Sequence, residues 1–296
     1  MILVVGSTGL LGREIVRLLR AADVPVRALV RASSDSSVQA TLREQGAETV
    51  VGDLKSPDSL AAACDGVRAV ISTASATLSR QPGDSIESVD EQGHLALVNA
   101  ARNARVDHFV HVSFAPLHVD CALQRAKRTV ERAVEESEMA HTILQPLDFM
   151  EVWLSPALGF DPVHGKARIL GDGQQPVNWV SFLDVARFAV AALEVPALRD
   201  KTLPLGGPDA LSQLDVVRLF EQLGGPKVEL EFVPEGALEA QLAGAQNPIE
   251  EAFAALMLNT ARGYRASPRA ALELVPGRMM TVREFATRQL KNAQQQ

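Results

Sequence analysis

The sequence predicts an α/β protein with a doubly wound parallel sheet and a smaller C-terminal α+β lobe. Short apolar segments typical of buried strands alternate with amphipathic helical segments through the first half of the chain. A glycine-rich turn joins the first strand to the first helix. After Pro146 the alternation stops and shorter elements follow. We therefore expect a first domain over residues 1–150 and a second lobe over residues 151–296, with segments near 178–206 returning to the main sheet.

Each element of the first half follows from its hydrophobic pattern. Continuous apolar runs favour parallel strands, because strands covered on both faces do not alternate with polar residues. The expected strands are Met1–Val5, Pro25–Val30, Glu48–Val51, Arg68–Ser72, Asp107–Ser113 and Thr142–Gln145. The expected helices include one beginning near Leu11, then Ser37–Gln45, Ser56–Cys64, His94–Asn103 and Cys121–Glu136.

Two further parts of the chain are less regular. The polar segment 76–93 follows the fourth strand, on the side where such sheets bind ligands, and it is either a flexible lid or an ordinary surface loop. In the second half, capping signatures predict helices after three Ser or Thr residues. The expected elements are helices after Ser181, Ser212 and Thr281, a helical region within 233–259, and strands Lys166–Leu170, Val177–Trp179 and Thr202–Leu205.

Composition excludes several classes of protein. The 296 residues carry a net charge of −7 with acidic and basic side chains interspersed, which argues against nucleic-acid binding and against an anionic membrane surface. No apolar run has the length of a transmembrane helix. Two cysteines without C-x-x-C spacing suggest a reducing compartment, and we expect a cytoplasmic protein. No metal site is expected, because His108 and His111 point to opposite faces of a strand.

The glycine-rich turn reads G-x-x-G-x-x-G and is one residue longer than the usual dinucleotide fingerprint. It favours a Rossmann-type domain whose helix N-terminus binds a pyrophosphate, and the alternative is a glycine-rich turn that binds nothing. We expect Gly12 to let the helix pack closely on the sheet. The predicted cofactor-binding residues here are Gly6, Ser7, Thr8, Gly9, Leu10, Leu11 and Gly12.

Other strand ends add to the predicted cofactor site. Arg31 ends the second strand, where an NAD-selective site has an acidic residue, so a cation there favours NADP; a solvated arginine is the alternative. Asp53, followed by Leu54, either accepts a hydrogen bond from adenine or is a turn residue. The small residues Ser72, Thr73 and Ala74 either admit ribose and pyrophosphate or serve packing alone.

Lys127 is the most informative charged residue. In the helix Cys121–Glu136 it lies on the edge of the apolar stripe, whereas Arg128, Glu131 and the other charges fall on the opposite arc and are expected to face water. An ammonium that faces inward needs a partner, and a cofactor ribose or a substrate oxyanion would serve. The alternative is that the side chain reaches back to the surface.

With these residues in hand, the chain resembles the atypical short-chain dehydrogenase/reductases, in particular the NmrA-like and triphenylmethane-reductase-like group. The match covers most of the chain and is weakest over residues 230–265. The matching residues are Gly6-x-x-Gly9-x-x-Gly12, Leu29-Val30-Arg31, Gly52-Asp53-Leu54, His111-Val112-Ser113, Lys127, Thr142-Ile143-Leu144-Gln145-Pro146-x-x-Phe149-Met150, Trp179-Val180-Ser181-x-x-Asp184-Val185-Ala186 and Thr281-x-x-Glu284-Phe285-Ala286.

The resemblance implies a Rossmann domain that binds NADP rather than NAD, with a C-terminal lobe for substrate. It implies that Pro146 and Phe149 also contact the cofactor, and that Lys127 and Ser113 are catalytic. Typical short-chain reductases carry Tyr-x-x-x-Lys with the tyrosine as proton donor, but here leucine takes the tyrosine's place. The chain's one tyrosine, Tyr264, is distant in sequence.

Two functions therefore stay open. The first is an NADPH-dependent reductase of a quinone-like or other conjugated, small apolar molecule, which the retained Lys127 favours. The second is a non-catalytic NADP(H) redox sensor or regulator that binds a protein partner, which the missing tyrosine favours.

Overall fold

The computed structural model of the protein describes residues 1–79 and 81–295. These residues form two compact units, each assembled from separate stretches of the chain. The first unit comprises Met1–Phe114, Ala122–Gln145 and Val185–Leu203, and the second comprises Ala115–Cys121, Pro146–Asp184 and Pro204–Gln296. Among the described residues, no helix combines the length and the apolarity needed to cross a membrane.

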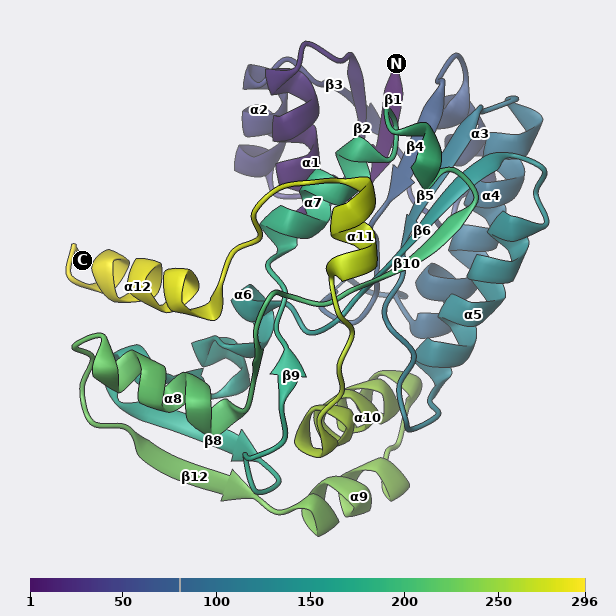
Figure 1. Ribbon diagram of the computed structural model, residues 1–296. Helices are drawn as coiled ribbons and strands as arrows, with labels where there is room; N and C mark the ends of the chain where they lie inside the picture. The colour runs from purple at the N-terminus through teal and green to yellow at the C-terminus, as the bar shows by residue number, and fades with distance from the viewer. Residues whose placement is uncertain (80, 296) are drawn as a thin grey trace. The chain divides into compact units, whose positions relative to one another are not determined.

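A seven-stranded sheet dominates the first unit (Figure 1), in the order β10-β6-β5-β4-β1-β2-β3. Strands β1 to β6 pair in parallel, and the order 3-2-1-4-5-6 is that of a Rossmann-type sheet. The predicted doubly wound parallel sheet is therefore confirmed. The strands are β1 (Ile2–Val5), β2 (Val26–Val30), β3 (Glu48–Val51), β4 (Ala69–Ser72), β5 (His108–Val112), β6 (Ala140–Pro146) and β10 (Lys201–Leu205).

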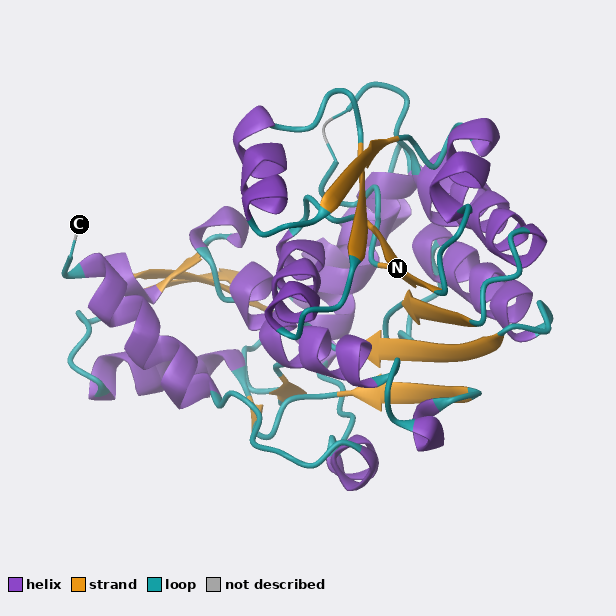
Figure 2. Ribbon diagram, turned by 90° about the horizontal axis from the view of Figure 1, so that it is seen from above, coloured by secondary structure: helices purple, strands orange, loops and turns teal. Residues whose placement is uncertain are grey.

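Helices cover both faces of this sheet, so β1 and β4 at its centre are buried along their whole length. Figure 1 shows α1 and α2 on one face, and α3, α4 and α5 on the other, and Figure 2 shows helices on either side of the strands. This two-sided cover explains why these strands are apolar throughout rather than alternating. The helices are α1 (Leu10–Ala21), α2 (Ser36–Glu44), α3 (Pro57–Cys64), α4 (Gln92–Asn103), α5 (Ala122–Glu135) and α7 (Phe182–Ala191).

The segment 76–93 is only partly a loop. Ser85 caps a π-helix, η1 (Ile86–Glu91), which runs directly into α4. Ile86, Val89 and Asp90 of η1 are buried. The reading of residues 86–93 as lid or loop is therefore wrong, because two apolar side chains in this polar stretch bury themselves and order it. Of the residues described before Ser85 in this segment, 76–79 and 81–84, none lies in a helix or strand.

The second unit is built from shorter elements around its own core. A three-stranded sheet has the order β12-β8-β7, and β9 pairs with β11. Its main hydrophobic cluster includes Trp179, Phe220 and Phe285. The elements are α6 (Met150–Trp153), η2 (Pro156–Leu158), β7 (Phe160–Asp161), η3 (Pro162–His164), β8 (Lys166–Leu170), β9 (Val177–Asn178), β11 (Ala210–Leu211), α8 (Gln213–Gln222), β12 (Glu229–Val233), α9 (Glu235–Ala243), α10 (Pro248–Arg262), α11 (Arg269–Leu274) and α12 (Val282–Ala293), with η4 (Pro196–Leu198) in the first unit.

Capping predicted two helix starts of the second unit correctly. Ser212 and Asp215 form a reciprocal capping box at α8, and Thr281 and Glu284 form another at α12. The sequence reading missed β12, whose residues are mostly exposed, because an exposed strand lacks the apolar run that marks a buried one.

Candidate functional site

The glycine loop leaves the carboxyl end of β1 and runs directly into α1. Gly6 has φ of +81°, which other residues rarely adopt, and a Cβ there would lie 2.8 Å from the backbone nitrogen of Ala74. A Cβ on Gly12 would lie 2.1 Å from the carbonyl oxygen of Gly6. The close contact at Gly12 is therefore with the loop itself, whereas we expected it with the sheet.

Gly9 has a different environment from the other two glycines. It is exposed, and a Cβ there would meet, among the described residues, only the carbonyl oxygen of Gly6, at 3.4 Å. Packing within the protein therefore does not require glycine at this position. Gly9 is the N-cap residue of α1 and has no side chain to cap it, and the first turn of α1 carries no acidic residue. The helix N-terminus thus offers backbone N–H groups and a positive dipole end to an anion.

The other predicted residues of the loop divide into buried and accessible positions. Ser7 is fully buried, and its Oγ donates a hydrogen bond to the carbonyl oxygen of Leu29 at 2.6 Å. Its side chain therefore ties the loop to β2 and is not available to a ligand. Leu11 is buried as well, whereas Thr8 is half-buried and Leu10 is exposed.

The end of β4 lies beside the loop because the strands are parallel and in register. Val5 pairs with Ser72, and Thr73 Oγ1 donates a hydrogen bond to the carbonyl oxygen of Val5 at 3.2 Å. Ser72 is fully buried, so its hydroxyl faces the interior rather than a ligand. Thr73 and Ala74 are half-buried at this edge of the sheet.

Asp53, which follows β3, is a turn residue. Its Oδ1 accepts a hydrogen bond from the backbone N–H of Lys55 at 2.8 Å, the bond of an Asx turn. Leu54 is buried, and a Cβ on Gly93 would lie 2.8 Å from the Leu54 Cβ, so Leu54 packs against the start of α4. A contact between Asp53 and adenine stays a prediction.

Arg31 lies at the end of β2, as predicted, but it is not simply solvated. Its Nη1 lies 2.5 Å from Oδ2 of Asp84, which comes from the irregular part of segment 76–93. Lys55 pairs with the other oxygen of the same carboxylate and lies 3.8 Å from Asp53. Two cations thus meet one buried carboxylate where the second and third strands end.

Lys127 faces inward, and its partner is a residue that the sequence analysis did not identify. The Nζ of Lys127 lies 3.0 Å from Oδ1 of Asp90 and 3.5 Å from the carbonyl oxygen of Ala74. Lys127 is 4% exposed and Asp90 is fully buried, so both charges are removed from water. The other oxygen of Asp90 accepts a hydrogen bond from the backbone N–H of Ala76 at 2.8 Å. The interaction that we expected from a ribose or a substrate is thus made in part by the protein itself.

Two buried histidines lie next to this ion pair. His94 Nδ1 is 2.7 Å from the carbonyl oxygen of Val89, to which it must donate, so its Nε2 accepts from the hydroxyl of Ser72 at 2.9 Å. Burial, and then the charge of Lys127, lowers the pKa of His94 to about 4. Burial also lowers the pKa of His111, whose ring centroid lies 5.2 Å from that of His94. Both rings are therefore neutral near pH 7.

No metal arrangement is seen in residues 1–79 and 81–295, where no three His, Cys, Asp or Glu side chains are grouped to hold an ion. The histidines of β5 have other contacts. His108 Nε2 lies 2.9 Å from Oγ1 of Thr142 on the neighbouring strand β6. Burial lowers the pKa of His108 to about 4.

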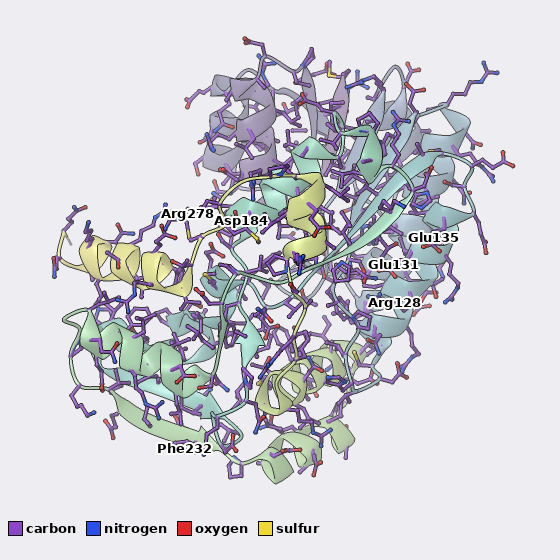
Figure 3. All side chains as sticks on the ribbon, viewed as in Figure 1. Arg128, Glu131, Glu135, Asp184, Phe232 and Arg278 are labelled. Carbon is purple, nitrogen blue, oxygen red and sulfur yellow. The ribbon has the colours of Figure 1, made fainter. Side chains whose placement is uncertain are left out.

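Ser113 follows β5 and is buried. Its neighbour on α5 is Arg128, which Figure 3 labels together with Glu131. Arg128 Nη2 donates to Ser113 Oγ at 3.4 Å and to the carbonyl oxygen of Phe114, and its guanidinium lies 5.5 Å from the Phe114 ring centre. Arg128 also pairs with Glu131 at 2.9 Å, and Glu131 accepts from Gln145 at 3.0 Å. The expectation that Arg128 and Glu131 face water is therefore wrong, because polar partners on the sheet side draw them in.

Pro146 and Phe149 lie in the second unit, and their contact with a cofactor stays a prediction. Between them, Asp148 accepts hydrogen bonds of 2.7 Å from the hydroxyls of Tyr264 and Thr260. Burial raises the pKa of Asp148 to about 6, although both hydrogen bonds oppose the shift. The one tyrosine of the chain is thus bound to a buried carboxylate in this unit.

Because the pKa of Asp148 is raised in the folded protein, we expect the stability of the protein to depend on pH. A raised folded-state pKa means that the folded chain holds the proton when the unfolded chain has lost it. The free-energy cost of ionising the buried Asp148 is therefore absent below about pH 4. It grows between about pH 4 and pH 6 and is constant above about pH 6. We expect the difference in unfolding free energy between wild type and Asp148→Asn to change by about 2–3 kcal/mol between about pH 4 and pH 7, measured by urea denaturation. An equal difference at both pH values would contradict this.

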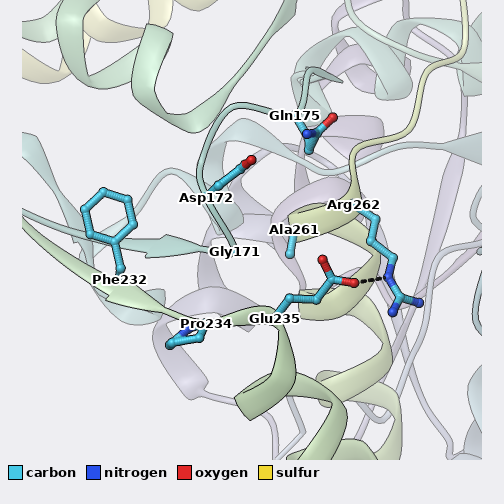
Figure 4. A pocket seen from close by; sticks show the side chains of 8 residues that line it. All are labelled: Gly171, Asp172, Gln175, Phe232, Pro234, Glu235, Ala261 and Arg262. Atoms are coloured by element: carbon cyan, nitrogen blue, oxygen red, sulfur yellow. Dashed lines mark hydrogen bonds and ion pairs between the residues drawn. The ribbon is translucent and has the colours of Figure 1, made fainter.

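A cavity of about 540 Å³ opens within the second unit (Figure 4). It includes none of the predicted site residues, and an ion pair of 2.6 Å between Arg262 and Glu235 lies on its wall. Its lining residues are Gly171, Asp172, Gln175, Phe232, Pro234, Glu235, Ala261 and Arg262.

Comparison with known proteins gives three results. The NmrA-like family model matches residues 1–286. An NAD(P)H azoreductase of Xenophilus azovorans is 35% identical over 230 residues, which are 77% of this chain and 75% of the relative. The photosystem II assembly factor Ycf39 of Synechocystis sp. is 32% identical over 242 residues, which are 80% of this chain and 72% of the relative. Citrobacter sp. triphenylmethane reductase, solved with NADP(H), has the same fold with a TM-score of 0.78 at 23% identity, covering 98% of this chain and 100% of that one.

Proposed function

We propose that this chain, which belongs to the NmrA-like family, is an NADPH-dependent reductase of a quinone-like or other conjugated, small apolar molecule. The observation that carries the proposal is the glycine loop with its unblocked helix N-terminus, next to two cations at the ends of β2 and β3. The 35% identity to an azoreductase supports a reductase rather than a redox sensor.

The residues of the first unit fit a dinucleotide with a 2′-phosphate. Gly9 leaves the space above the N-terminus of α1 open for a pyrophosphate. Arg31 and Lys55 supply positive charge where an NAD-selective site would have a lone carboxylate. When bound, NADPH supplies a hydride to the acceptor.

The chain's own residues supply positioning and positive charge. An ammonium has three donors. Lys127 Nζ donates one of them to the carbonyl oxygen of Ala74 at 3.5 Å and forms an ion pair with Asp90 Oδ1 at 3.0 Å. A further donor holds the cofactor ribose or polarises the acceptor. Ser113, held by Arg128, assists at the end of β5. A quinone that takes up a hydride also needs a proton, which comes from water or from Lys127.

The direct test is steady NADPH oxidation by the purified protein with a panel of quinones and azo dyes. The proposal expects turnover that depends on the acceptor. Tight, redox-selective NADP(H) binding without turnover on any acceptor would support the sensor instead, and with it a role closer to the assembly factors among the relatives.

We expect Arg31→Ala to weaken NADPH binding by about 10–100-fold and NADH binding by less than about twofold, because only NADPH carries the 2′-phosphate that a guanidinium binds. Fluorescence titration of both dinucleotides measures this. Arg43→Ala is the matched control, since Arg43 is an exposed arginine on α2 with no contact to the Asp84 cluster. Equal loss for both dinucleotides would remove the argument for a 2′-phosphate site.

The remaining parts of the proposal rest on the sequence. Residues 1–150 bind the cofactor, and residues 151–296 provide the substrate lobe, with segments near 178–206 belonging to the main sheet. Pro146, the last residue of β6, and Phe149, the N-cap residue of α6, contact the cofactor. The composition favours a cytoplasmic protein.

A further inference from the structure

One buried carboxylate sits between the two cations of the proposed phosphate site. Asp84 has a side chain that is 3% exposed, whereas those of Arg31 and Lys55 are 35% and 30% exposed. Arg31 binds one oxygen of Asp84 at 2.5 Å, and Lys55 binds the other. Ser79 donates a further hydrogen bond to Asp84 Oδ2. The carboxylate is thus surrounded by donors in the way that a bound anion would be.

The ionisation of Asp84 agrees with this arrangement. Burial raises the pKa of Asp84, but hydrogen bonds from Lys55, Ser79 and Arg31 outweigh burial, so the pKa lies below its usual value. Asp84 is therefore negatively charged at neutral pH. Asp84 and Asp53, whose carboxylate lies 3.8 Å from Lys55 Nζ, then balance the positive charges of Arg31 and Lys55.

A 2′-phosphate brings about two negative charges and needs the same donors. If Asp84 stayed in place, the phosphate, Asp84 and Asp53 would bring about four negative charges against the two positive charges of Arg31 and Lys55, and the phosphate would find the donors of both cations already engaged. An NADP 2′-phosphate and the Asp84 carboxylate therefore exclude each other. A ribose 2′-hydroxyl carries no charge and does not need both cations, so NAD can bind while Asp84 stays paired with Arg31 and Lys55.

The backbone around Asp84 is held by few hydrogen bonds: the N–H of Asp84 donates to the carbonyl oxygen of Gln81 at 3.2 Å, and Ser88 Oγ donates to the carbonyl oxygen of Gly83 at 3.0 Å. Ser85 caps η1 through a reciprocal bond with Ser88, which fixes the chain from Ser85 onward, including Asp90. Gly83 precedes Asp84 with φ of +76°, and a Cβ there would meet no described atom within 4 Å. Asp84 thus lies between the capped start of η1 and a glycine with open space at its Cα.

We propose that Asp84 is an internal anion that competes with the 2′-phosphate of NADP for Arg31 and Lys55, and so determines how strongly the protein prefers NADP over NAD. This inference rests on the proposed NADPH-dependent function. It makes Asp84 a specificity-determining residue that lowers NADP affinity in the wild-type protein.

Asp84→Asn tests the inference, because asparagine keeps the shape and a hydrogen-bond acceptor but removes the charge. We expect it to tighten binding of NADPH and of 2′,5′-ADP by about tenfold, with less than about twofold change for NADH. Glu87→Gln removes one charge from an exposed position three residues away and should change neither. Isothermal titration of wild type and both variants with NADPH, 2′,5′-ADP and NADH measures these affinities.

The other outcomes overturn the inference in distinguishable ways. Unchanged or weaker NADPH binding by Asp84→Asn would mean that Asp84 only orients the cations. Weaker NADH binding would place Asp84 on the cofactor ribose instead. If Asp84→Asn does not fold, hydrogen exchange of the backbone amides of residues 81–88 in the wild-type protein tests the inference instead. We expect 2′,5′-ADP to accelerate this exchange and 5′-AMP to leave it unchanged. Wild-type protein that binds neither NADPH nor NADH would overturn the proposed function as well, whereas NADPH binding with an unaltered NADPH-to-NADH ratio in Asp84→Asn overturns only the inference.

Discussion

Replacing Gly9 with alanine is expected to weaken NADPH binding by about 100-fold or more and to cost less than about 1 kcal/mol of unfolding free energy. The backbone at Gly9 has φ of −77° and ψ of 169°, which alanine adopts without strain. The added methyl group would touch only the carbonyl oxygen of Gly6 among the described residues, at an ordinary 3.4 Å. It would, however, occupy the space above the N-terminus of α1, where the pyrophosphate needs close approach to the backbone.

Gly12→Ala provides the contrast that makes this result interpretable. Its methyl group would come within 2.1 Å of the Gly6 carbonyl oxygen, which is backbone and cannot rotate away. We expect a loss of about 1–3 kcal/mol in unfolding free energy, by analogy with overpacked cores. Chemical denaturation and NADPH titration of the two variants therefore separate loss of fold from loss of binding. Normal NADPH affinity in Gly9→Ala would show that the loop does not hold a pyrophosphate.

Local pattern was enough to predict the main sheet and the glycine loop. Strands β1 and β4 at the centre of the sheet are fully buried because helices cover both faces, and this requirement is visible in the apolar run of each strand separately. The capping boxes at Ser212 and Thr281 depend on residues three apart, so they are also visible locally. The inward orientation of Lys127 follows from helical periodicity within α5 alone.

The partners of the predicted site residues could not be found in this way. Asp84 is 53 residues from Arg31, and Asp90 lies in a segment whose polar composition indicates a loop. Nothing in the local sequence distinguishes these two carboxylates from their exposed neighbours, such as Glu87. Both become part of the site only because the end of β4 and helix η1 carry them to the carboxyl edge of the sheet. Glu131 illustrates the same limit, since Gln145 of another element accounts for its burial.

Lys127→Met is expected to abolish most NADPH-dependent turnover, by at least about 100-fold, and also to lower the unfolding free energy by about 3–5 kcal/mol. The second effect arises because Asp90 is fully buried and would lose the cation 3.0 Å away, keeping only the N–H of Ala76 as a partner. A loss of activity in this variant alone would thus not show whether Lys127 acts on a substrate or merely keeps η1 in place. Urea denaturation and steady-state assays are both needed.

The double variant Lys127→Met/Asp90→Asn resolves the ambiguity. Asparagine removes the unpaired charge but still accepts the hydrogen bond from Ala76, so we expect most of the lost stability to return. If Lys127 contacts cofactor or acceptor, turnover stays lost in the refolded, stable double variant. If instead turnover returned together with stability, Lys127 would be a structural cation and the acceptor would take its proton from water. The Lys127–Asp90 pair is the right place for this test, because here the residue retained from the family's Tyr-x-x-x-Lys pattern is also a buried ion-pair partner.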